Sequence, residues 1–314
     1  MAAPVIPAIT SGYANFLQPK WHRILVEVGS EIEDLWRNVF NHDPDMAWSP
    51  LQESQISGLG QMVSKPEGSG FTMDSIIEGG SVTYTSKPWG LGFEWTIEMM
   101  RFDLYGIFDD IAADLVRAAP HRVELESWAL VNDAFDGLLY TGFDAKSLVN
   151  NAHPFLDAVQ GTFSNISATN IALSQAGIQE ALLFYNTMKD MRGLPNRRRP
   201  VLVLIKPDRI PAAREVLQSE FDPKSSNNAI NTIVDDQLKY YAVRYLTSAS
   251  AWHMISRPMA GNRGHDVWVR MAIPPLPDSF EDRRTKSSVQ TMYQNFSIGF
   301  GGAFGWWGSK GNGS

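Results

Sequence analysis

The chain of 314 residues contains no cysteine. Disulfide scaffolds, zinc sites with cysteine ligands and thiol catalysis are therefore excluded, while a reducing compartment is compatible with the sequence without being required. Histidine is scarce as well, and no two of the six histidines lie at the short spacing that places two ligands on one face of a helix. We therefore expect neither a metal site nor a cofactor.

Long hydrophobic runs are also missing. No window approaches the roughly 20 uninterrupted apolar residues that a membrane span needs. The N-terminal stretch MAAPVIPAITSGYANFLQPKW has no basic leader and carries three prolines, so it is interpreted as an extended arm rather than a signal peptide. We expect a protein that is made in the cytosol and has no membrane partner.

Basic residues are outnumbered. The 27 lysines and arginines against 34 acidic residues give a net charge of −7, which argues against a surface built to grip nucleic acid. Hydrophobic residues make up 44% and charged residues 19% of the chain, as in a soluble globular protein with a sizeable core.

The sequence has no GxSxG, HExxH or P-loop motif. The neighbouring carboxylates Asp109–Asp110 and Asp235–Asp236 are interpreted as solvated groups, because adjacent side chains point different ways. His153 is interpreted as a polar loop residue held by its neighbours, with a general base as the alternative. His253, in an expected strand, is interpreted as structural. We assign no catalytic residue.

What the chain does have is a change of period. Leu91, Phe93 and Trp95 recur at every second residue, whereas Ile107, Ile111 and Leu115 are spaced by four. This pattern predicts a strand that runs into an amphipathic helix over about 102–137, roughly 50 Å long. Pro120 lies in its middle and predicts a kink or two helices end to end, because proline inside a helix costs about 3 kcal/mol.

A long β-hairpin is expected over 71–98. Its predicted turn is EGGS, with Gly79 and Gly80 free to adopt positive φ. We expect the hairpin to project from its domain, so Glu78, Gly79 and Gly80 are candidate contacts with another chain.

The rest of the chain predicts a mixed α/β region. A first helix is expected near 21–40. Further helices are expected over 173–193 and 211–220, and strands over 201–205, 239–246, 251–256, 267–273 and 289–300. Large aromatic residues on protruding segments suggest burial against another chain; these are Trp89, Trp95, Trp306 and Trp307. Arg197, Arg198 and Arg199 are interpreted as a solvated turn, with a phosphate contact or an intersubunit salt bridge as alternatives.

The order of these elements resembles the tailed-phage major capsid proteins that share the fold first seen in phage HK97. The segments that carry the resemblance are LGFEWTIEMMRFDLYGIFDDIAADLVRAA, RPVLVLIKPDRIPAAREVLQSE, NNAINTIVDDQLKYYAVRYLTSASAWHMISRP and FEDRRTKSSVQTMYQNFSIGFGGAFGWWGS. A fifth segment, LVNNAHPF, is similar to a loop of Mu-type head proteins.

The resemblance implies an α+β fold with an arm, an extended hairpin (E-loop), a spine helix in a peripheral (P) domain and a mixed α/β axial (A) domain. The expected divisions are the arm and first helix over 1–50, the E-loop over 51–100, the P domain over 101–165, the A domain over 166–279 and the return strand over 280–314. Pro120 becomes a candidate hinge.

The function implied is that of a major capsid protein which assembles as pentamers and hexamers into an icosahedral shell around double-stranded DNA, without sequence-specific binding. Expected partners are other copies of the chain, a separate scaffolding protein, a portal and a decoration protein. The expected location is the virion, after synthesis in the cytoplasm of a bacterial host. Two alternatives stay open: an encapsulin-type protein compartment, and a soluble enzyme with an unrecognised site.

Overall fold

The computed structural model describes residues 35–96, 98–99, 107–196, 198–219, 231–257, 267–282, 284–285 and 287–312. The arm, most of the helix expected over 21–40 and the start of the long helix lie outside the described residues, as does Arg197. Of that first helix, only a 3-10 turn, η1 (Leu35–Asn38), is described.

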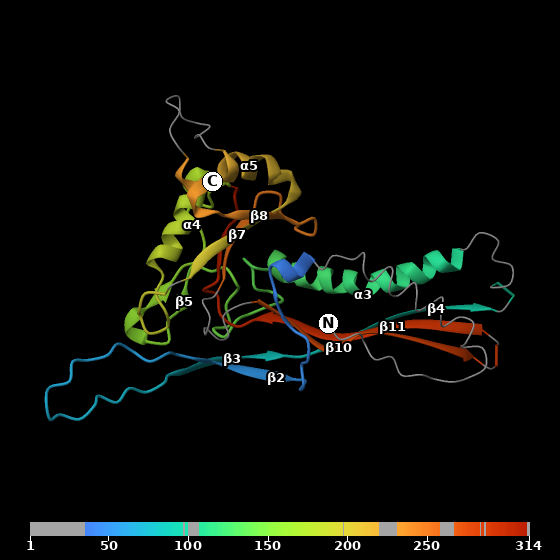
Figure 1. The fold of residues 1–314 in the computed structure, drawn as a ribbon, viewed down its shortest axis with the longest axis horizontal. Coiled ribbons are helices and arrows are strands. Elements are labelled where there is room, and N and C mark those ends of the chain that lie inside the picture. Colours follow the sequence, from blue (N-terminus) through green and yellow to red (C-terminus); the bar gives the residue numbers. More distant parts are fainter. Residues whose placement is uncertain are drawn as a thin grey trace.

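A four-stranded sheet forms one half of the molecule (Figure 1). Its order is β1 (Asn41–Asp43), β10 (Val267–Asp282), β11 (Ser287–Phe300) and β4 (Lys87–Thr96), with β1 parallel to β10 and the other pairs antiparallel. Alternate residues of β11 are buried, because strand side chains point to opposite faces in turn; these are Gln290, Met292, Gln294 and Phe296. Met292 packs against Leu115, Val116 and Ala119 of the long helix.

The long helix, α3 (Ile107–Asn132), lies along this sheet and contains Pro120 (Figure 1). Its 26 described residues span about 39 Å. The expectation of two separate helices is wrong, because one helix continues through the proline. It also ends five residues earlier than expected, where the Asp133 carboxylate accepts hydrogen bonds from the backbone N–H groups of Leu138, Leu139 and Tyr140.

The second half is a smaller α/β unit. Its sheet has the order β12 (Trp306–Ser309), β9 (Trp252–Arg257), β7 (Arg199–Ile205) and β8 (Lys239–Ala242). Helices α4 (Gln175–Thr187) and α5 (Ile210–Gln218) pack on it. The predicted helices and strands of this region are present, but α4 ends six residues before the expected 193 and β8 ends four residues before the expected 246. The short elements around it are β5 (His153–Pro154), η2 (Ala158–Gln160), β6 (Thr162–Phe163), η3 (Pro207–Arg209) and η4 (Thr232–Asp236).

One hydrophobic core joins the two halves. It contains Trp128 of α3, Phe296 of the long sheet, and Leu204 and Trp306 of the smaller sheet. None of the helices in the described part of the chain combines the length and apolar character needed to cross a bilayer.

The projecting hairpin differs from the prediction. Its strands are β2 (Leu51–Ile56) and β3 (Glu78–Tyr84), joined by residues 57–77, whereas β4 pairs with β11. The predicted turn at 78–81 is therefore wrong: Gly79 and Gly80 lie within β3, and neither has a positive φ. The hairpin turns instead at Pro66–Ser69, where Ser69 N donates to Pro66 O (3.2 Å) and Gly68 has a φ of +79°.

The aromatic prediction is also wrong for most of its residues. Trp95, Trp306 and Trp307 are buried within their own chain. The two C-terminal tryptophans are buried because the segment forms β12 beside β9. Trp89 is half-buried, stacked on Phe296 with the Arg122 guanidinium 3.7 Å from its ring centroid.

Candidate assembly surface

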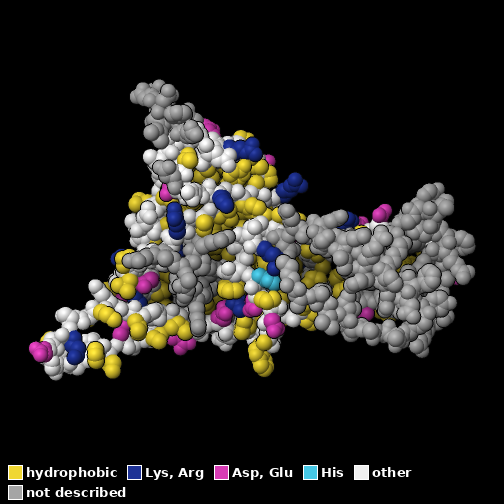
Figure 2. All heavy atoms as spheres, in the orientation of Figure 1, with side chains coloured by type: hydrophobic (Ala, Val, Ile, Leu, Met, Phe, Trp, Pro, Cys, Tyr) yellow, Lys and Arg dark blue, Asp and Glu magenta, His cyan; other side chains and the backbone are white. Residues whose placement is uncertain are grey.

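Of the large apolar side chains in the described residues, the two most exposed lie on the hairpin that projects from the body (Figures 1 and 2). We call residues 57–77 the hairpin loop. Its exposed apolar residues are Leu59, Met62, Val63, Phe71, Met73 and Ile76, with Met62 98% and Met73 90% exposed. Single exposed apolar residues are normal, but a group on one element marks an interaction site. This loop was missed as the turn of the hairpin, although the PEGS stretch at its tip is a signal that could have indicated it.

A second exposed apolar group lies on the long sheet. Leu276 and Phe280 of β10 and Tyr293 of β11 are exposed, and Leu276 pairs with Tyr293 in the register. They alternate with the residues that face α3, so they lie on the opposite face of the sheet. This surface was missed because β10 was expected to end at 273, before its prolines. Proline is tolerated there because β1 pairs with β10 only as far as Arg270, which leaves an edge.

Arg270 anchors the root of the hairpin. Its guanidinium donates to Glu53 of β2 (Nη2–Oε1, 2.6 Å) and to Asp43 of β1 (Nη1–Oδ2, 3.2 Å). It also lies 4.4 Å from the centroid of the Tyr84 ring in β3. Burial, and then the Glu53 charge, raise the pKa of the Tyr84 phenol to about 12. Both hairpin strands are thus attached to the long sheet through one buried cation.

The glycines expected at the tip lie at this root instead. A Cβ on Gly80 would sit 1.9 Å from the Phe143 carbonyl oxygen, and one on Gly79 would sit 2.4 Å from Leu156 Cδ2. Glycine is therefore required at position 80 for close approach to another backbone segment rather than for a turn, whereas at position 79 the Leu156 side chain could rotate away. Glu78, at the start of β3, is exposed.

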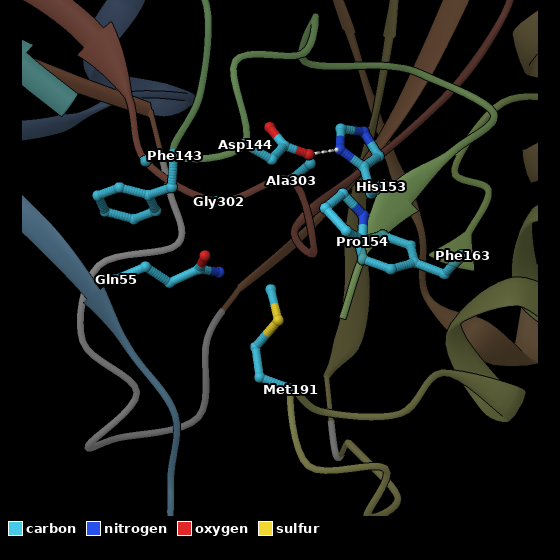
Figure 3. Close-up of a pocket in the computed structure, with 10 residues that line it drawn as sticks. Gln55, Phe143, Asp144, His153, Pro154, Phe163, Met191, Gly302 and Ala303 are labelled. Carbon is cyan, nitrogen blue, oxygen red and sulfur yellow. Dashed lines mark hydrogen bonds and ion pairs between the residues drawn. The ribbon is translucent and has the colours of Figure 1, made fainter. Parts of the chain in front are cut away.

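A small pocket lies where the hairpin meets the body (Figure 3). Gln55 of β2 faces Phe143, Met191 and the His153–Pro154 strand across it. His153 Nδ1 is 2.6 Å from Asp144 Oδ2, as the dashed line in Figure 3 marks, and its ring stacks on Phe163. The space, about 10 Å³, suits one water molecule.

This pocket offers little for catalysis. None of the described residues that line it carries a hydroxyl, thiol or amine that His153 could activate. His153 is buried rather than exposed on a loop, and it is held by Asp144 and Phe163 as neighbours. Across the described ranges, no three His, Asp or Glu side chains are grouped as metal ligands.

The remaining candidates are dispersed. Arg198 is buried, so it does not belong to a solvated turn, whereas Arg199 begins β7 and is exposed. His253 is buried beside Phe135 and Trp306, and burial lowers the pKa of its imidazole to about 4, as expected of a structural histidine. Pro120 is half-buried inside α3. The structure does not bring these residues together with Glu78 or Trp89 into one site.

Comparisons with solved structures identify the fold. The chain superposes on a protein of Mycobacterium phage Patience with a TM-score of 0.56 and 12% identity, covering 98% of this chain and 94% of that one. For Microbacterium phage Oxtober96 the TM-score is 0.52 with 10% identity and the same coverage. The acid-stable capsid of Helicobacter pylori bacteriophage KHP30 gives 0.51 and 10%, covering 86% and 85%. The α+β arrangement is thus the HK97-like fold, which confirms the fold prediction.

The family follows from the sequence itself. No curated protein matches the chain. A family model described as phage capsid protein matches residues 79–304, well over half of the chain, from the projecting hairpin to the end of the long sheet. The chain therefore belongs to the phage capsid protein family and is a subunit of the phage shell.

Proposed function

We propose that this subunit assembles as pentamers and hexamers into an icosahedral head that encloses double-stranded DNA. The observation that carries the proposal is the hairpin loop, an element with exposed apolar side chains and little core of its own. Loops of this kind gain burial only against another molecule.

The second apolar surface supplies a partner for the loop. The face with Leu276, Phe280 and Tyr293 is offered by every copy, so the loop of one subunit can lie across the sheet of the next. Each contact can be weak, because closed symmetry repeats it and every subunit is held by several others.

The domain names follow as a proposal with revised limits. The E-loop corresponds to 51–84 rather than to 51–100. The P domain combines α3 with the long sheet, and so takes β10 from the 166–279 segment. The A domain combines residues 166–257 with β12, which comes from the 280–314 segment.

We further propose that the protein is structural and catalyses no reaction, and that it is made in the cytoplasm of a bacterial host. A separate scaffolding protein, a portal and a decoration protein are its proposed partners beside its own copies. The net charge of −7 suits a shell that confines DNA without adhering to it.

An encapsulin-type compartment would use the same contacts, so the contents of the particle separate the two functions. Electron microscopy of the purified protein should reveal closed shells, and those recovered from infected cells should contain DNA rather than an enzyme. A stable monomer at high concentration would contradict both.

The hairpin loop can be tested directly. Met62→Asp with Met73→Asp should abolish shells while leaving the subunit folded, because a charge at these positions opposes burial against a neighbour. Leu138→Asp is the matched control, because Leu138 is also highly exposed (84%) but lies outside the hairpin loop. This variant should still give shells. Normal shells from the double variant would show that the loop is not an assembly contact.

A further inference from the structure

A cluster of three residues ties the hairpin loop to the body of its own chain. Asp74, in the returning leg, accepts a hydrogen bond from Gly60 N of the outgoing leg (Oδ2, 2.6 Å). Its other oxygen, Oδ1, is 2.5 Å from Arg192 Nη2. Ser75 N also donates to Oδ1 (2.9 Å). We call Gly60, Asp74 and Arg192 the clasp; it joins both legs of the loop to the segment that follows α4.

The body side of the clasp is held in place. Asp190 Oδ1 accepts from the backbone N–H groups of Arg192 and Leu194, each at 2.9 Å. Met191 O accepts from Asp157 N (3.3 Å), which connects the same segment to the region around η2. Arg192 therefore approaches the loop from an ordered turn, with its side chain only 14% exposed.

The loop side is closely packed at Gly60. A Cβ on Gly60 would lie 3.2 Å from Asp74 Oδ2 and 3.4 Å from Arg192 Nη2. The first distance is tighter than most van der Waals contacts and the second is at their lower limit, so a side chain at this position would press on both partners of the ion pair. Gly58, two residues earlier, has no such neighbour within 4 Å and is the matched position for comparison.

The clasp is suited to release. Asp74 is 39% exposed, and ion pairs at the surface contribute little stability because water and salt screen them. The hydrogen bond from Gly60 N, followed by that from Arg192, keeps the pKa of the Asp74 carboxyl below its usual value. The clasp is therefore formed at neutral pH, yet weak enough to exchange for contacts that bury apolar surface.

We infer that the clasp is a conformational latch that holds the hairpin loop against its own subunit before assembly and opens when the loop docks on a neighbouring copy. The inference rests on the proposed function. Closed, the latch sets the direction in which the apolar residues of the loop point. Once the latch is open, both legs of the loop can adjust to the surface of the neighbouring copy. The closed latch therefore lowers the rate at which subunits assemble.

Charge reversal tests the latch. Asp74→Arg and Arg192→Asp should each open it, and the double variant Asp74→Arg with Arg192→Asp should restore the ion pair. Hydrogen exchange of the amides in 57–77 is measured on unassembled subunits. We expect severalfold faster exchange in each single variant. The double variant should exchange more slowly than either single variant but faster than the unaltered protein, because an arginine at position 74 cannot accept the hydrogen bond from Gly60 N. Glu67→Arg, at the tip of the same loop, makes the same change of charge outside the clasp and should leave exchange unaltered.

Assembly is then followed by light scattering and electron microscopy. We expect each single variant to assemble severalfold faster or into particles of altered size, and the double variant to return part of the way to normal assembly. Unchanged exchange in the single variants would overturn the latch as a contact. Faster exchange with unaltered assembly would overturn its role in assembly, while the shell function would stand. Failure of the unaltered protein to form shells would instead contradict the proposed function.

Discussion

The guanidinium of Arg270 lies 2.6 Å from the Glu53 carboxylate, across more than two hundred residues of sequence. The Arg270 side chain is only 6% exposed, so the positive charge that holds the hairpin root is buried. Because the same guanidinium contacts Asp43 and the Tyr84 ring, β1, β2 and β3 share a single cation from β10. Both strands of the hairpin are therefore attached to the long sheet through one side chain.

Removal of this cation should destabilise the subunit. Arg270→Ala leaves two carboxylates without their partner, and we expect a loss of about 2 kcal/mol, less than for a fully buried pair because both carboxylates are partly exposed. Thermal unfolding measures the loss, and limited proteolysis between β2 and β3 reports on the hairpin.

Arg117→Ala is the control for Arg270→Ala. Arg117 pairs with Asp114 on the surface of α3, and both side chains are at least half exposed. We expect a change within about 0.5 kcal/mol. Equal stability of the two variants would show that Arg270 does not anchor the root.

Gly80→Ala should displace the hairpin. The new methyl group would overlap the Phe143 carbonyl oxygen, which belongs to the backbone and cannot rotate away. We expect a loss of about 1–3 kcal/mol, in the range found for overpacked sites, with faster hydrogen exchange at 142–144. Gly70→Ala, where nothing lies within 4 Å, should be close to neutral. Equal effects of the two changes would contradict the close approach.

The local elements were predictable because their cause is local. Val203, Leu204 and Ile205 form a continuous apolar run with a buried strand as its simplest structure, and α3 repeats apolar residues at helical spacing. Pro120 misled the prediction of helix continuity. Leu115 precedes Pro120 and Val131 follows it, and the two residues pack in different core clusters. These contacts hold the helix along the body in spite of the proline.

The hairpin was misplaced because its pairing depends on distant residues. Two adjacent glycines are typical of a turn, yet Gly79 and Gly80 face the Phe143 and Leu156 segments, and no local pattern encodes that contact. The same holds for Trp306 and Trp307, whose burial depends on the pairing of β12 with β9. The exposed residues of the hairpin loop were still harder to predict, because an exposed apolar side chain indicates a contact surface only when the burial of the other apolar residues is known.

Acid should weaken the fold through His253. Burial lowers the pKa of its imidazole to about 4, from 6.5 in the unfolded chain. Between these values the unfolded state binds the proton and the folded state does not, so the free energy of unfolding is highest above pH 6.5 and falls as the pH drops towards 4. The full difference is about 3 kcal/mol.

The measurement is chemical denaturation at a series of pH values. His253→Gln should flatten the fall in stability between pH 6.5 and 4, even if the variant is less stable throughout. His121→Gln, on the exposed side of α3, should keep the slope of the unaltered protein. The idea fails if both variants retain that slope.

Pro120 weakens α3 from within the helix. Inside a helix proline removes one backbone hydrogen bond, and its ring crowds the preceding turn. Pro120→Ala should therefore stabilise the isolated subunit by up to about 3 kcal/mol, provided that the neighbouring contacts, such as Gln294 Nε2 to Ala119 O at 2.9 Å, are kept.

If α3 must also bend at this proline when the shell changes shape, the same variant should slow that change, because a regular helix resists bending. Hydrogen exchange over 112–125 in newly assembled and in expanded shells measures both effects: a hinge predicts a difference in the unaltered protein that the variant reduces. A more stable variant with unchanged shell expansion would leave Pro120 as a cost to the helix and no hinge.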